Sequence, residues 1–192
     1  LKGLARRIAE ERILPVRAEL DETEEYPWSI IKDIADSDLF RVFVPEKYDG
    51  LGGGTLELCL VVEELSRVCG AVAVSYAVCA LGAYAILLYG NEEQKQKYLP
   101  QMAAGKKLCA FGLTESAAGS DAGNIKTTAE KTPNGYLING TKQFITNGGE
   151  ADIYTIIALT DKSKGARGAS ALGGLERRLE QLALGGADLA VL

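Results

Sequence analysis

The chain has 192 residues, of which 47% are hydrophobic and 24% charged, a composition typical of a soluble globular protein with one or two domains. Its net charge is −5 and its lysines and arginines form no basic stripe, so no nucleic acid is expected as a partner. The sequence has no histidine, and none of its four cysteines lies in a CxxC pair. These absences exclude the usual zinc sites and the Ser–His and Cys–His catalytic pairs.

The first part of the chain is predicted to be helical. Apolar residues at helical spacing predict a first helix, which Pro15 either kinks or splits. Pro27 and Trp28 are typical of a helix start, and three isoleucines follow them at helical spacing. Residues 39–54 are expected to form a loop, because the sequence breaks there at a proline and a glycine cluster.

Further helices are predicted up to residue 104. Thr55 and Asn91 are the expected N-caps of two of them. Between these caps, residues 68–89 carry no charge and are long enough to span a bilayer. Alanine, glycine and serine dilute this segment, so we expect a buried core helix and no membrane span. Stable partitioning of the folded protein into membranes would contradict that expectation.

After Lys107 the hydrophobic period changes from 3.6 to 2, which predicts strands. The Asn134–Gly135 turn predicts a β-hairpin, and residues 140–147 and 151–160 predict two more strands, because they are rich in β-branched and aromatic residues. Helices first and strands second predict an α+β fold, with an N-terminal all-helical domain followed by a partial antiparallel β domain.

Three parts are expected along the chain: an N-terminal helical domain over residues 1–109, a partial middle β domain over 110–171, and an atypical leucine- and glycine-rich tail over 172–192. The composition of the tail differs from everything before it. Within it, residues 175–184 predict a short amphipathic helix that would pair with a partner helix.

The stretch AFGLTESAAGSDAGN combines an apolar start with small polar residues. Thr114, Ser116 and Ser120 supply hydroxyl groups, and Gly119 permits a ligand to approach the backbone closely. Successive N–H groups in such a turn can bind a pyrophosphate, although a plain loop has the same composition. Neither a P-loop nor a GxGxxG motif is present.

Two motifs together resemble signatures of the acyl-CoA dehydrogenase family: AFGLTESAAGSDA, and the residues FITN from Phe144 to Asn147. The segments VPEKYDGLGGG, VVEELSRV and YGNEEQKQKYLPQMAAG resemble the helical domain of that family and occur in the same order. The resemblance extends over residues 1–171. It implies a helical N-terminal domain, a middle β domain and a C-terminal helical bundle.

The resemblance also implies an activity. Members of the family bind FAD without a covalent bond and remove hydrogens from Cα and Cβ of an acyl-CoA thioester. Electron-transfer flavoprotein would accept the electrons, and the intact protein would be a homo-oligomer. The later part of the sequence resembles short-chain members, and the expected location is cytoplasmic, or the mitochondrial matrix in a eukaryote.

By resemblance, eight residues are expected to bind FAD: Phe111, Leu113, Thr114, Gly119, Ser120, Phe144, Ile145 and Thr146. Thr114 would bond the edge of the isoalloxazine ring. Gly119 and Ser120 would meet the pyrophosphate, and Ser120 would also touch the CoA part of the substrate. Phe144 stands where many members have tryptophan. No residue is assigned as catalytic, and Glu115 is interpreted as structural rather than as a base.

The sequence departs from the family pattern at three places. Ser116 replaces a common proline, and Cys79 stands where a histidine is frequent. After residue 171 the resemblance ends, and we expect a truncated, inactive member with a foreign tail, lacking the glutamate that the family uses as its base. Two alternatives stay open: a non-catalytic helical and β module that associates through its tail, and a relative of the acyl-CoA oxidases.

Overall fold

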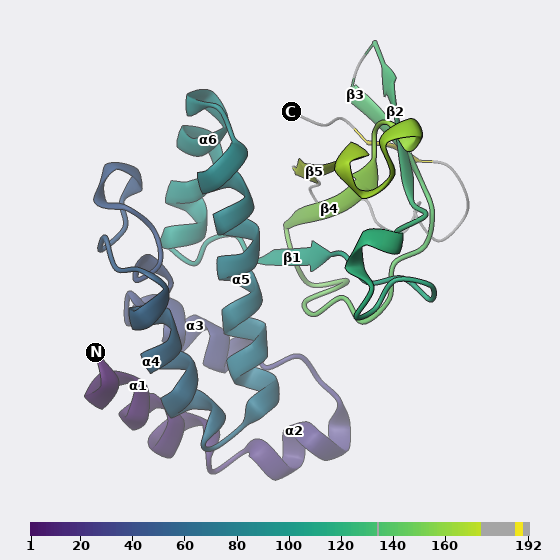
Figure 1. Cartoon of the computed structure of the whole chain (residues 1–192). Helices are drawn as coiled ribbons and strands as arrows, with labels where there is room; N and C mark the ends of the chain where they lie inside the picture. Colours follow the sequence, from purple (N-terminus) through teal and green to yellow (C-terminus); the bar gives the residue numbers. More distant parts are fainter. Residues whose placement is uncertain (134, 174–186, 190–192) are drawn as a thin grey trace. The chain divides into compact units, whose positions relative to one another are not determined.

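The computed structural model describes residues 1–133, 135–173 and 187–189 (Figure 1). The chain forms two compact units, Leu1–Leu108 and Cys109–Leu192. The first is built of helices and the second contains the β-sheet. The predicted α+β class is therefore confirmed.

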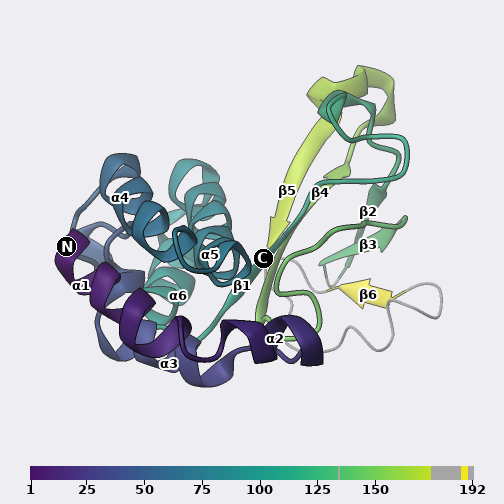
Figure 2. The ribbon, with the colours of Figure 1, turned by 90° about the horizontal axis from the view of Figure 1, so that it is seen from below.

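The helical unit contains six α-helices and three short helical turns. In two views, α1 lies along α4, and α5 lies beside both α4 and α6 (Figures 1 and 2). The elements are α1 (Lys2–Ile8), a π-helical turn η1 (Ala9–Ile13), α2 (Arg17–Thr23), α3 (Trp28–Asp36), the 3₁₀ turns η2 (Leu39–Arg41) and η3 (Glu46–Tyr48), α4 (Thr55–Ser66), α5 (Gly70–Tyr89) and α6 (Glu92–Ala103).

The helix boundaries follow the local sequence at most of the predicted positions. Pro15 lies in the turn that separates η1 from α2, and Pro27 is the N-cap of α3, as predicted. Asn91 caps α6: its Oδ1 accepts a hydrogen bond from Gln94 N at 2.9 Å, and Gln94 Oε1 accepts one from Asn91 N at 2.8 Å.

The prediction of Thr55 as an N-cap was wrong by one residue. Gly54 is the N-cap of α4, and Thr55 is already the first helical residue. The cap forms without a hydroxyl group, because Glu57 accepts a hydrogen bond from Gly54 N at 2.8 Å. This bond satisfies the N–H of the N-cap residue, and the N-cap itself has no side chain to accept a hydrogen bond from the first helical N–H groups, as a Thr55 cap would have done.

The uncharged segment forms α5. It is the one helix within the described residues whose length and composition would allow it to cross a membrane. Ten of its residues are buried inside the structure, among them Tyr76, whose hydroxyl donates a hydrogen bond to Leu39 O at 2.9 Å. This burial favours a core helix, as expected from the sequence.

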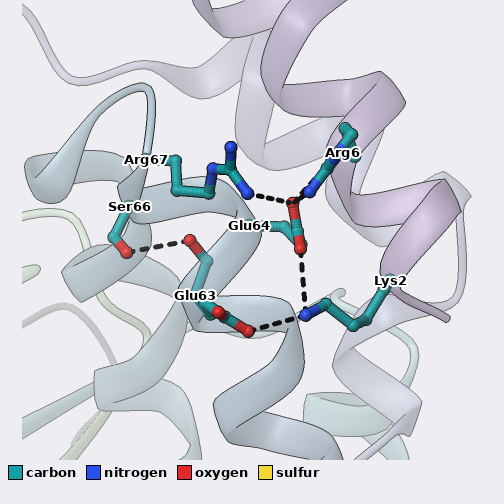
Figure 3. A network of polar contacts seen from close by, with 6 residues as sticks. All are labelled: Lys2, Arg6, Glu63, Glu64, Ser66 and Arg67. Carbon is teal, nitrogen blue, oxygen red and sulfur yellow. Dashed lines mark hydrogen bonds and ion pairs between the residues drawn. The ribbon is translucent and has the colours of Figure 1, made fainter.

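A cluster of charged side chains fastens α1 to α4 (Figure 3). The Glu64 carboxylate, which is 1% exposed, lies 2.8 Å from Arg6 Nη2 and 3.3 Å from Lys2 Nζ. The hydrogen bond from Arg6 lowers the pKa of Glu64, and Lys2 acts in the same direction against the cost of desolvation. A buried carboxylate therefore joins two helices that lie far apart in the sequence.

The described part of the β unit contains six strands in one sheet of order β1-β4-β2-β3-β6, with β5 paired to β4. Its strands are β1 (Cys109–Gly112), β2 (Thr128–Thr132), β3 (Gly135–Asn139), β4 (Ile153–Leu159), β5 (Ala169–Gly173) and β6 (Ala187–Leu189). The predicted hairpin is confirmed, because β2 pairs with β3 in antiparallel register from Thr132–Gly135 to Thr128–Asn139. The predicted strand at 151–160 is confirmed as β4.

Two expectations for this unit are corrected. The sheet is mixed rather than purely antiparallel, because β1 and β2 both run parallel to β4. The long connection between β1 and β4, which contains the hairpin, lets the chain return in the same direction.

Residues 140–147 form no strand. Phe144 and Asn147 take left-handed φ values of 56° and 62°, which are incompatible with an extended chain. The predicted helix at 175–184 lies outside the described residues.

Candidate functional site

The small-residue stretch begins where β1 ends. Glu115 and Ala118 close a tight turn. The backbone N–H of each donates a hydrogen bond of 3.1 Å to the carbonyl oxygen of the other. Asn124 Nδ2 donates to Ala117 O at 3.0 Å and holds the far side of the same turn. Gly119 follows in open space, since a Cβ placed there would meet nothing within 4 Å. The turn thus presents accessible backbone immediately after it closes.

The second motif lies directly against the first. Gln143 N donates a hydrogen bond to Thr114 O at 3.0 Å, and Lys142 Nζ donates one to Leu113 O at 2.9 Å. Further along, Asn147 Nδ2 donates to Cys109 O at 3.0 Å. These three bonds fix the loop 142–147, which we call the FITN loop, along β1 and the residues that follow it.

Gly112 permits this close approach. A Cβ at Gly112 would lie 2.7 Å from Ile156 Cδ1, which is too short for any real contact, and 3.9 Å from Ile145 Cδ1. Because Cδ1 is the far end of a flexible side chain, a larger residue at position 112 would require Ile156 to move, and glycine avoids this shift. The same measurement places Ile145, a predicted flavin contact, beside the end of β1.

Phe144 is the most unusual residue of the site. Its side chain is 87% exposed, the highest value among the large hydrophobic residues that the structure describes. Its backbone is left-handed, with φ at 56°, a conformation that costs a non-glycine residue about 1–2 kcal/mol. The fold thus holds an aromatic ring in solvent at an energetic cost. Backbone strain of this kind is found repeatedly at active sites and ligand clamps.

The two motifs also carry hydrogen-bond donors and acceptors. Within residues 1–133, 135–173 and 187–189, the hydroxyl groups of Thr114, Ser120 and Thr146 have no protein partner. Thr114 and Thr146 are partly buried, whereas Ser120 is exposed. Phe111 and Leu113 are partly buried and add apolar surface. The described part of the chain contains no cluster of three or more residues able to hold a metal ion.

Glu115 is the electrostatic centre of the turn. Its Oε1 accepts hydrogen bonds from Lys142 Nζ at 2.8 Å and from Thr127 N at 3.0 Å, and its Oε2 accepts one from Lys126 N at 2.6 Å. Burial alone would raise its pKa, but the hydrogen bonds, led by that from Lys142, outweigh burial and lower the pKa to about 2. Such a carboxylate stays ionised, and both of its oxygens are bonded to protein groups, as suits a structural role.

The structure therefore brings Leu113 and Thr114 together with the FITN loop that carries Phe144, Ile145 and Thr146. Gly119 and Ser120 lie beyond the closed turn, and no bond in the described part of the chain joins them to that loop. Reasoning from the sequence missed Lys142 and Asn147 as the tethers between the two motifs. Each lies far from its partner in sequence, and no local pattern signals such pairs.

Comparisons with known proteins identify two family domains along the chain. The family model described as the acyl-CoA dehydrogenase N-terminal domain matches residues 1–106, and that described as the acyl-CoA dehydrogenase middle domain matches residues 110–179. An acyl-CoA dehydrogenase of Bacillus subtilis is 44% identical over 172 residues, and a short-chain-specific acyl-CoA dehydrogenase of Clostridium acetobutylicum is 43% identical over 172 residues. Each alignment covers 89% of this chain and 45% of the relative.

A solved structure is similar throughout the described fold. Butyryl-CoA dehydrogenase from Megasphaera elsdenii superposes with a TM-score of 0.85 at 40% identity, covering 92% of this chain and 47% of that one. This chain spans about half the length of the curated relatives it matches. On the family match and the shared fold together, the chain belongs to the acyl-CoA dehydrogenase family.

Proposed function

We propose that the chain contributes the FAD cradle of a dehydrogenase that acts on short-chain acyl-CoA thioesters. The observation that carries this proposal is the FITN loop bonded against Leu113 and Thr114, with the exposed ring of Phe144 held in a left-handed backbone. A flavin needs an apolar or aromatic wall, a few donors and acceptors at its ring edge, and accessible backbone for its phosphates. The residues present fit these needs.

Each side chain has a role in this proposal. Phe144 and Ile145 offer apolar surface to the isoalloxazine ring, together with Phe111 and Leu113. The hydroxyl groups of Thr114 and Thr146 hydrogen-bond to its edge. Gly119 and Ser120 bind the pyrophosphate, where open backbone permits close approach. When bound, FAD supplies the acceptor for the hydrogen that leaves Cβ of the substrate.

The substrate and the electron acceptor belong to the same proposal. Ser120 is exposed beside the pyrophosphate position and can also hydrogen-bond the CoA portion of the substrate. The names of two similar proteins, one specific for short chains and one for butyryl-CoA, support a short acyl group. By family resemblance, electron-transfer flavoprotein receives the electrons, and the protein acts as a homo-oligomer.

Titration of the purified chain with FAD tests this proposal. We expect saturable binding to the unaltered chain, monitored by the change in flavin absorbance. The affinity for FAD should fall when Thr114 is changed to valine. Subsequent addition of butyryl-CoA should perturb the bound flavin spectrum more than a long-chain acyl-CoA does. No saturable binding up to about 1 mM FAD, the limit of weak affinity, would contradict the cradle. Rapid reaction of reduced bound flavin with oxygen would instead favour an oxidase.

A further inference from the structure

Glu115 and Lys142 form an ion pair that is almost completely buried. Their side chains are 6% and 9% exposed, and the two charged atoms lie 2.8 Å apart. Glu115 follows β1 by three residues, whereas Lys142 begins the FITN loop, so the pair joins the two motifs of the site. Neither charge reaches solvent freely.

The pair is part of a wider set of bonds. Lys142 also donates to Leu113 O at 2.9 Å, and Glu115 receives the backbone N–H groups of Lys126 and Thr127 at 2.6 and 3.0 Å. Three separate segments are therefore fixed to one another: the turn after β1, the chain entering β2, and the FITN loop. Thr114 lies between the two residues that Lys142 contacts.

Stability alone does not account for this arrangement. Apolar residues of similar volume generally stabilise a buried site as well as an ion pair does, because desolvation of the two charges offsets their attraction. What an ion pair adds is a defined geometry, since its bonds have required directions. Here the groups held in place are the backbone of Leu113 to Glu115 and the start of the loop that carries Phe144.

We infer that Glu115 and Lys142 are positioning residues for the flavin: the pair fixes Thr114 and the FITN loop, and its two opposite charges balance one another beside them. This inference rests on the proposed function. Both side chains are bonded to protein groups, so neither is expected to touch the flavin ring. The pair acts on the cofactor through geometry and through its electric field.

The electric field of the Glu115–Lys142 pair has a consequence that can be measured. Reduction adds negative charge to the flavin, so a nearby uncompensated charge shifts the midpoint potential of the bound cofactor. Lys142→Met leaves the Glu115 carboxylate unbalanced and should lower the potential. Glu115→Gln leaves the Lys142 ammonium unbalanced and should raise it. The double variant restores neutrality, and its potential should lie between those of the single variants.

The experiment measures the midpoint potential and FAD affinity of the unaltered full chain and the three variants. Each single variant should also bind FAD about tenfold more weakly, because Thr114 and the FITN loop are no longer held in the binding geometry. Lys142→Arg keeps the charge and should hold the potential near that of the unaltered chain. The double variant leaves no buried charge unpaired, so it supplies a folded protein if a single variant does not fold.

Two results separate the possible failures. If the unaltered chain binds FAD and both single variants shift its potential in the same direction, or not at all, the pair is purely structural and the inference is wrong. If the unaltered chain binds no FAD, the proposed function itself fails, and the inference fails with it. A double variant that binds FAD as tightly as the unaltered chain would also overturn the positioning role.

Discussion

Phe144 combines an exposed aromatic ring, which adds little packing energy to the fold, with a left-handed backbone, which is strained. In water the ring gains almost nothing from packing, and the backbone strain is retained. The neighbouring residues hold it there, because Gln143 is bonded to Thr114 O and Asn147 to Cys109 O on either side. Under the proposed function, contact with the flavin would offset the strain of this backbone.

Substitution of Phe144 should separate stability from binding. Phe144→Gly removes the strain and little packing, so it should raise the free energy of unfolding by up to about 1 kcal/mol. Phe144→Ala keeps the strained backbone and gives no such gain, which makes it the matched control. Both variants should weaken FAD binding by about tenfold in equilibrium titrations. A glycine variant less stable than the unaltered chain, or unchanged affinity in both variants, would contradict the assignment.

Glu115 should make the stability of the chain depend on pH in the acid range. Its pKa falls from an ordinary 4.5 to about 2 on folding. Because the pKa is lower in the folded state, the ionised carboxylate stabilises the fold at pH values above the pKa of the unfolded chain. This stabilisation, about 3 kcal/mol, is lost as the pH falls from about 4.5 to 2. Denaturant titrations across that range should show a weaker pH dependence in Glu115→Gln.

Glu92→Gln is the surface control for this comparison. Its carboxylate is paired with Lys47 at 2.8 Å but is 56% exposed, so solvent screens the pair. The slope of stability against pH should change much less in this variant than in Glu115→Gln. Equal changes of this slope in the two variants would show that the buried Glu115–Lys142 pair contributes no more to the pH dependence than a surface pair does.

At the scale of the element, α6 offers a clean test of local structure. Asn91 and Gln94 exchange hydrogen bonds at 2.9 and 2.8 Å, and Tyr98, Leu99 and Met102 bury the inner face of the helix. Asn91→Ala should therefore lower the free energy of unfolding by about 1 kcal/mol. Asn91→Asp retains an acceptor at the cap and should preserve most of that stability in the same denaturant titration. An alanine variant as stable as the unaltered chain would show that packing alone fixes the end of α6.

Several elements could be predicted because their signals are local. Pro27, Asn91 and the turn at Gly135 act on the residues beside them, and α3, α6 and the β2–β3 hairpin were predicted correctly. The FITN loop was mistaken for a strand, because its β-branched and aromatic residues are also typical of strands. The Asn147–Gly148 pair is a local turn signal that was overlooked, whereas the left-handed backbone of Phe144 has no local signal in the sequence.

The same distinction between local and long-range signals holds for the candidate site. Its two motifs were identified from the sequence by family resemblance, and the structure adds that they are joined through Lys142 and Gln143. The parallel pairing of β1 with β4 was also missed, since strand direction depends on the path of the whole connection. Long-range pairing of charges and strands is the information that a single sequence does not display.

At the scale of the whole molecule, the chain divides into a helical unit and a β unit, and the cradle residues all belong to the β unit. A ligand that binds only the folded state stabilises it by about 2.7 kcal/mol at a hundredfold excess over its dissociation constant. Saturating FAD should therefore raise the stability of the β unit. Its effect should be smaller in the Lys142→Met and Phe144→Ala variants.

Hydrogen exchange followed by mass spectrometry, with and without saturating FAD, tests the central claim most directly. Peptides covering residues 111–120 and peptides covering 142–147 should gain protection together when FAD is added. Protection of the surface turn η5 (Lys162–Gly168) of the same unit should change little. If neither cradle segment gains protection, or only one does, the two motifs do not form a common flavin site, and the account is contradicted.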